Sequence, residues 1–144
     1  MILVMQIFLV GTVLETAKCL DNRRFNKQII EVRQIRNAIE GNSKGWKNHP
    51  VTKMYEKYFD FLLDYELCLR LYKHGNIKSA ERFSDRCEKE KPDFLKNAEW
   101  YFENMKNRLY TKNKEHYSQY FPHAVESYSN FYYVDSEWKE YKQK

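Results

Sequence analysis

Apolar residues recur at helical spacing in the segment that follows Asp21. The apolar positions of residues 22–40 lie on one face of a helix and are Phe25, Ile29, Val32 and Ile39. Asp21 or Asn22 can cap the N-terminus of this helix, and Gly41 ends it. The pattern therefore predicts a long amphipathic helix with one buried face.

A second long pattern predicts one helix from Pro50 to about His74, with Gly75 just past its end. Its apolar stripe repeats every seven residues and consists of Tyr55, Tyr58, Leu62, Tyr65, Leu69 and Tyr72. Further apolar residues widen the apolar face, which is typical of a helix at the centre of a domain. We expect the tyrosines to belong to the core and not to a platform for stacking bases.

The remaining pattern is also mainly helical. It predicts a short helical turn at residues 15–20, a polar helix at 77–90 broken by Pro92, a helix capped by Asp93 that reaches about Lys112, and a turn at 115–120. Residues 117–141 contain nine aromatic side chains and should fold back onto the helices. Four Gly and three Pro leave little turn chemistry for a many-stranded sheet. We expect an all-α fold, a compact helical bundle with its aromatic C-terminal tail packed on it, in one domain over residues 1–144.

Residues 1–13 are almost wholly apolar. This stretch is too short to span a bilayer, and it lacks the basic start and cleavage pattern of a signal peptide. We expect it to dock in the core and expect no membrane partner. Met5 is an alternative start of the chain.

The three cysteines are Cys19, Cys68 and Cys87, an odd number with wide spacing and no CxxC pair. Buried free thiols in a reducing compartment explain them better than a metal site or a disulfide does. The chain also lacks a P-loop, a dinucleotide fingerprint and a Ser-His-Asp order, so we expect neither a metal nor a cofactor.

Positive charge gathers on the first long helix. The net charge is +5 and the sequence pI is about 9.0; residues 18–36 hold six cations against two carboxylates. Helical geometry brings Arg24, Lys27, Gln28 and Glu31 together beside the apolar stripe, next to the core without being in it. The charge suggests a polyanionic partner, with DNA as the first choice.

Glu31 is the only carboxylate on this face and could move a proton. It could equally form an ion pair with Arg24 or Lys27 within the helix, which contributes only about 0.5 kcal/mol. His49 before Pro50 could contact a phosphate or cap the next helix. The later basic residues Lys106, Arg108 and Lys112 could line a groove with the first helix or be solvated surface.

Four segments carry a resemblance to the pyrimidine-dimer DNA glycosylase superfamily, the endonuclease V type of phage origin, and above all to a less characterised bacterial and viral branch. They are MQIFL at residues 5–9, LDNRRFNKQIIE at 20–31, GWKNHPVTKMY at 45–55, and KNKEHY at 112–117 followed by Phe121-Pro122. The first two segments are the more specific ones. The resemblance covers most of the chain.

The resemblance implies a compact helical enzyme whose N-terminal α-amine forms an imine with the sugar of an extruded nucleotide. It also implies a glutamate on an early helix and arginines that bind phosphate. The basic residue before that glutamate falls at Lys27 and the glutamate at Gln28, so Glu31, one turn on, would replace it.

The chain departs from this pattern in two further places. Ile2 or Gln6 would follow the initiator methionine, and neither favours its removal, so the amine would be that of Met1 or Met5. The branch's Ser-His-Arg falls at residues 104–106, which are Asn-Met-Lys.

These observations predict a DNA-repair glycosylase and AP lyase that acts on damaged or modified pyrimidines in double-stranded DNA. The catalytic candidates are Glu31, Gln28, Met1 and Met5, and the nucleic-acid-binding candidates are Arg23, Arg24, Lys27, His49, Lys106 and Lys112. Such an enzyme would act inside a cell, in the cytoplasm or with the nucleoid or nucleus, and could be viral. Two alternatives stay open: a non-catalytic nucleic-acid-binding protein that kept the fold, and a structural protein that binds partners through its aromatic tail. The oligomeric state is not predicted.

Overall fold

The structure is a computed structural model that describes residues 5–42 and 45–143. The described residues form seven α-helices, one 3₁₀ turn and one β-hairpin. The elements are α1 (Val13–Cys19), α2 (Asn22–Ile39), α3 (Pro50–Tyr55), α4 (Phe59–Lys73), α5 (Ile77–Glu90), η1 (Asp93–Leu95), α6 (Glu99–Lys112), α7 (Lys114–Tyr117), β1 (Ser129–Val134) and β2 (Glu137–Lys142). The prediction of a mostly helical fold with an aromatic C-terminal region packed on it is confirmed.

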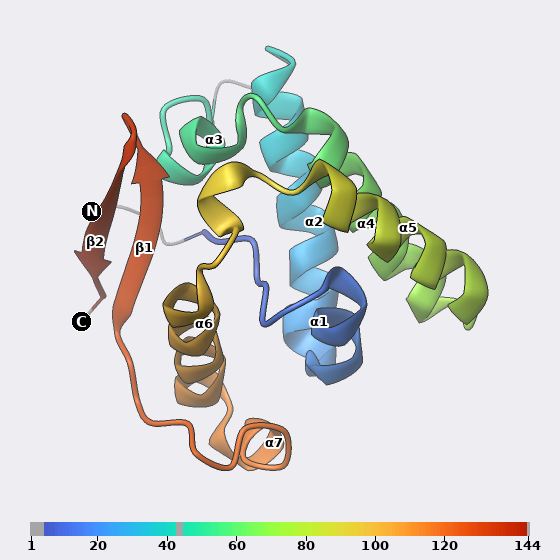
Figure 1. Cartoon of the computed structure of the whole chain (residues 1–144), viewed down its shortest axis with the longest axis vertical. Coiled ribbons are helices and arrows are strands. Elements are labelled where there is room, and N and C mark those ends of the chain that lie inside the picture. The colour runs from blue at the N-terminus through green and yellow to red at the C-terminus, as the bar shows by residue number, and fades with distance from the viewer. Residues whose placement is uncertain (1–4, 43–44, 144) are drawn as a thin grey trace.

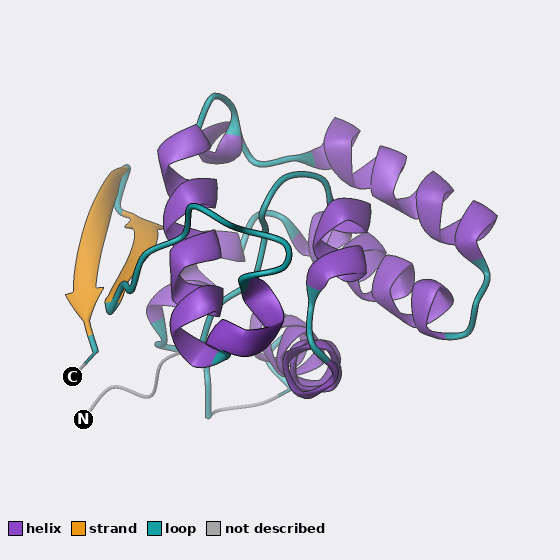
Figure 2. Cartoon of the chain, turned by 90° about the horizontal axis from the view of Figure 1, so that it is seen from below, coloured by secondary structure: helices purple, strands orange, loops and turns teal. Residues whose placement is uncertain are grey.

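Helix α2 lies between the α4–α5 pair and α6 across the width of the molecule, and the hairpin lies beyond α6 (Figures 1 and 2). The core between these layers includes Val32, Ile35, Leu62, Leu69 and Met105, all fully buried. The stripes that predicted α2 and α4 are therefore their buried faces. Tyr55 and Tyr65 belong to this core, as expected.

The N-terminal segment of residues 5–9 runs extended and fully buried through this core. It has no strand partner in the part of the chain that the structure describes, so side chains must satisfy its backbone. The Gln28 amide accepts from the Phe8 N–H and donates to the Gln6 carbonyl (2.9 Å). The Tyr65 hydroxyl lies 2.6 Å from the Phe8 carbonyl and 3.0 Å from Gln28 Oε1.

Two more side chains complete this support at the ends of the segment. The Tyr132 hydroxyl of β1 donates to the Met5 carbonyl (2.9 Å), and the Thr16 hydroxyl of α1 accepts from the Val10 N–H (3.1 Å). Docking of the segment in the core is thus confirmed for residues 5–9 and Val13, whereas residues 10–12 are only half-buried and residues 1–4 lie outside the described residues.

The single helix expected from Pro50 to His74 is wrong, because the chain forms two helices with a turn at residues 56–58. Tyr58 leaves the helical conformation (φ −124°, ψ 41°), and its N–H bonds the Tyr55 carbonyl. The turn lets the Tyr55 and Phe61 rings stack with centroids 6.1 Å apart. An unbroken helix would set these two side chains on different faces.

The helix expected from Asp93 also begins later than predicted. Residues 93–95 form only a 3₁₀ turn, and Asn97 then adopts a left-handed conformation (φ 57°) that a helix cannot contain. The α6 helix starts at Glu99 and ends at Lys112, where the pattern placed its end.

The aromatic tail folds back as expected, but it does so as a β-hairpin. Asp135 and Ser136 form a two-residue turn with positive φ (55° and 63°), which matches the twist of paired strands without any glycine. The three cysteines are buried free thiols, as predicted, and burial raises the pKa of Cys19 to about 12.

Arg108 of α6 fixes the hairpin to the helices from a fully buried position. Its guanidinium donates to Asn130 Oδ1 (3.0 Å), to the Ser127 carbonyl (2.7 Å) and to Gln143 Oε1 (2.6 Å). These hydrogen bonds give each guanidinium nitrogen an acceptor and so offset part of the free-energy cost of burying the charge.

We expect Arg108→Leu to lower the free energy of unfolding by about 3 kcal/mol, because it leaves buried acceptors without a donor. Urea unfolding followed by circular dichroism measures this change. Arg82→Ala is the control, since Arg82 is exposed and its side chain bonds only Ser79 within residues 5–42 and 45–143. Equal stability of the two variants would contradict the role given to Arg108.

Candidate active-site cleft

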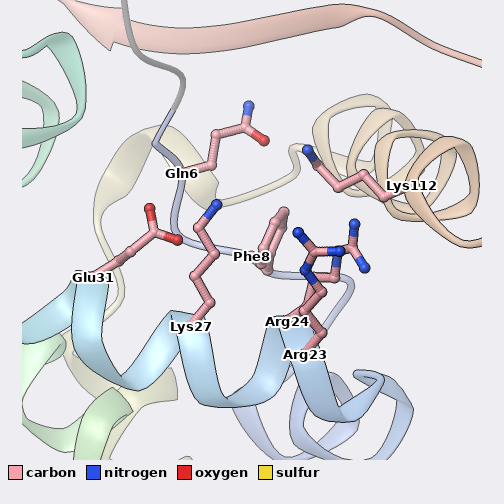
Figure 3. Close-up of a pocket in the computed structure, with 7 residues that line it drawn as sticks. All are labelled: Gln6, Phe8, Arg23, Arg24, Lys27, Glu31 and Lys112. Carbon is pink, nitrogen blue, oxygen red and sulfur yellow. The ribbon is translucent and has the colours of Figure 1, made fainter.

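Seven of the described residues, from three parts of the chain, line a cleft beside α2 (Figure 3). Helix α2 supplies four of them, the N-terminal segment two and the end of α6 one. They are Arg23, Arg24, Lys27 and Glu31, then Gln6 and Phe8, then Lys112. We call this set the Glu31 cleft. It brings together five of the residues that the sequence put forward.

Glu31 is the only acid in the Glu31 cleft, and its side chain is only 8% exposed. It makes no hydrogen bond or ion pair with the described residues. Burial raises the pKa of Glu31 to about 6, although the positive charges of Lys27 and Lys112 act to lower it. A carboxyl with such a pKa can both give and take a proton near neutral pH.

Lys112 faces this acid from the opposite wall, because the end of α6 is tied to the start of α2. Asp21 accepts from Asn113 Nδ2 (3.0 Å) and from the Tyr117 hydroxyl (2.6 Å). Burial alone would raise the pKa of Asp21, but these bonds and the charge of Arg24 lower it overall. Asp21 is therefore ionised. By accepting these hydrogen bonds it holds the residues that follow Lys112 next to the start of α2.

The cations of α2 differ in how firmly they are held. Arg24 is half-buried and bonds Asp21 (3.2 Å). Arg23 and Lys27 are exposed and have no ion-pair partner among the described residues. The open side of the Glu31 cleft is thus positively charged, as an anionic ligand requires.

Gln6 was missed by sequence reasoning. It is 4% exposed, and neither its amide nitrogen nor its amide oxygen has a hydrogen-bond partner in the described parts of the chain. The one signal for it was its place as the only polar residue among residues 5–10. An unpaired buried amide at a cleft is a group that a ligand can satisfy.

Gln28 and Met5 lie beneath the Glu31 cleft and do not line it. Gln28 is fully buried, and its amide bonds the backbone of the N-terminal segment. The expectation that Gln28 lies next to the core without being in it is therefore wrong. The α2 helix turns this side chain inward because it continues the buried stripe. Met5 is 2% exposed, and Met1 lies outside the described residues.

His49 and Lys106 are not among the side chains that line the Glu31 cleft. His49 caps α3 by accepting from the Val51 N–H (3.0 Å), and its ring contacts those of Trp46 and Tyr132. Lys106 pairs with Glu103 (2.9 Å) and lies over the Phe121 ring. Arg108, from the same basic group, is structural.

Within residues 5–42 and 45–143, no three His, Cys, Asp or Glu side chains gather in a way that could hold a metal ion. Among the helices of these residues, none combines the length and apolar character needed to cross a membrane.

A family model described as pyrimidine dimer DNA glycosylase matches residues 5–71. The resemblance expected from the sequence is confirmed over this range, which contains every residue of the Glu31 cleft except Lys112. Neither the curated proteins nor the solved structures gave a match.

We expect Glu31→Gln to stabilise the protein at alkaline pH. The pKa of Glu31 is higher in the folded chain (about 6) than its ordinary value of 4.5, so its contribution to stability is complete below pH 4.5 and is lost as the pH rises through about 6. The glutamine stays neutral, so the variant should exceed wild type by up to about 2 kcal/mol at pH 8 and match it at pH 4. Urea titrations at both pH values test this, and an equal difference at the two would contradict it.

Gln6→Met should also stabilise the protein, because it removes an unpaired amide while keeping the side-chain volume. We expect a gain of roughly 1–3 kcal/mol in the free energy of unfolding. Gln119→Met, at an exposed position, is the control and should change little. A loss of stability in Gln6→Met would mean that the amide has a partner in solution.

Proposed function

We propose that the protein is a DNA glycosylase and AP lyase that acts on damaged or modified pyrimidines through an imine intermediate. The observation that carries the proposal is the Glu31 cleft, where one buried acid with a raised pKa lies among four cations. All of its lining residues except Lys112 belong to the part of the chain that matches the glycosylase family. A DNA substrate follows from that family.

Each group in the cleft has a role in this proposal. Arg23, Arg24 and Lys27 hold the phosphates on either side of the target nucleotide. Glu31 gives a proton to the leaving oxygen or base and takes one back. The Gln6 amide offers a donor and an acceptor to the edge of the extruded pyrimidine. His49 and Lys106 remain candidate phosphate contacts beyond the cleft.

Gln28 favours a second candidate, a nucleic-acid-binding protein without catalysis. It occupies the position where the resemblance calls for a glutamate, and its amide is committed to the backbone of the N-terminal segment. This candidate predicts steeply salt-dependent DNA binding without cleavage.

Trapping with sodium borohydride on duplex DNA that carries one abasic site, and on UV-irradiated duplex DNA, distinguishes the two. We expect wild type to cut the strand and to yield a covalent adduct. Glu31→Gln should lower the rate about 10²–10⁴-fold while its DNA affinity stays close to that of wild type. Glu40→Gln, at the exposed end of α2, should behave as wild type.

The other outcomes separate the remaining functions. DNA bound without adduct or cleavage would overturn the enzyme and support the non-catalytic candidate. No DNA affinity at low salt, together with an oligomer in solution, would support the structural protein with an aromatic contact surface.

A further inference from the structure

We infer that Lys112 is the amine that forms the imine in this protein. The inference rests on the proposed function and deepens it, because it replaces the N-terminal α-amine with a side chain on α6. Lys112 lies outside residues 5–71, so the family match does not assign it any role.

The position of Lys112 is built into the fold. Its neighbour Asn113 and the nearby Tyr117 both bond Asp21, and the His116 ring bonds the Cys19 carbonyl (2.8 Å). These contacts hold Asn113 and α7, which directly follow Lys112, against the junction of α1 and α2. Figure 3 shows the Lys112 ammonium reaching from α6 toward the side chains that rise from α2.

The charges around Lys112 favour its neutral form. It is half-buried and has no carboxylate at ion-pair distance among the described residues. Burial lowers its pKa to about 8, helped by Arg108 on its own helix and by Arg24 and Lys27 on α2, against the opposite effect of Glu31. At pH 7.5 roughly a quarter of such an amine is neutral, compared with about a thousandth of an ordinary lysine.

Lys27 is the other lysine of the Glu31 cleft, but it is exposed to solvent. An exposed cation at the open side of the cleft can reach the phosphates of a bound strand. Lys27 therefore suits phosphate binding, whereas Lys112 suits attack on a carbon.

The step balances without any further reactant. Neutral Nζ of Lys112 attacks the C1′ aldehyde carbon of an opened abasic sugar; the C–N bond forms as the π pair of the C=O bond moves to oxygen. A proton then passes from Nζ to this oxygen, which gives the neutral carbinolamine. The carbinolamine hydroxyl takes a proton from Glu31 and leaves as water, which gives the protonated imine. Glu31, now a carboxylate, can remove a C2′ proton, which leaves an enamine with a C1′=C2′ double bond. The enamine electrons then form a C2′=C3′ double bond as the C3′–O bond breaks, and the 3′ phosphate leaves with the electron pair of that bond.

Lys112→Arg tests the inference, because arginine keeps the positive charge and length but cannot form an imine. We expect the borohydride-trapped adduct with abasic-site DNA to fall at least 100-fold, while DNA affinity stays within about threefold. In wild type the adduct should form fastest near pH 7, because Lys112 (pKa about 8) must be neutral while Glu31 (pKa about 6) still holds its proton. Mass spectrometry of the digested adduct should place it on Lys112. Lys114→Arg, which keeps its pair with Glu126 on the surface, is the matched control and should trap normally.

Two results would overturn the inference in different ways. An adduct that survives in Lys112→Arg and maps to the N-terminal peptide would leave the proposed function intact and return the role to the α-amine. No adduct from wild type at any pH would remove the proposed function together with the inference. Mapping the wild-type adduct settles the site even if Lys112→Arg folds poorly.

Discussion

The buried extended segment of residues 5–9 is the constraint on which the rest of the structure depends. A backbone that crosses a core without a strand partner must find its hydrogen bonds on side chains. Gln28, Tyr65 and Tyr132 supply them from three different elements, and Thr16 of a fourth element bonds Val10, the residue that follows the segment. Each of these elements is thereby held against the same segment, and the Gln6 side chain is directed into the Glu31 cleft.

This constraint also explains which residues the cleft can use. A carboxylate at position 28 would face the Gln6 carbonyl oxygen and would have no hydrogen to donate to it, and an ionised group would be costly to bury there. The amide is the residue that fits, so an acid for the cleft has to come from the next turn of α2. Glu31 meets that need because it lies at the edge of the core. Lys112 opposes it only because Asp21 ties α6 to α2.

Elements whose pattern is local could be predicted from the sequence. The spacing of residues predicted helix α2 and its cation-bearing face, and it placed Glu31, Lys27 and Arg24 together on that face. The breaks at residues 56–58 and 96–98 could not be predicted, because they depend on contacts between rings distant along the chain and on a left-handed asparagine. Gln6 was missed for a similar reason: no periodicity tells which way a residue of an unpaired buried segment points.

The chemistry of the cleft comes from burial acting in opposite directions on two groups. Low exposure raises the pKa of the Glu31 carboxyl to about 6 and lowers the pKa of the Lys112 amine to about 8. The pKa values of an ordinary glutamate and an ordinary lysine differ by about six. The pKa values of Glu31 and Lys112 lie close enough together for the two groups to exchange a proton near neutral pH. The charges of Arg24 and Lys27 on α2 lower the pKa of the Lys112 amine further. The same charges attract a phosphate backbone. Binding and reactivity in this cleft therefore have one electrostatic origin.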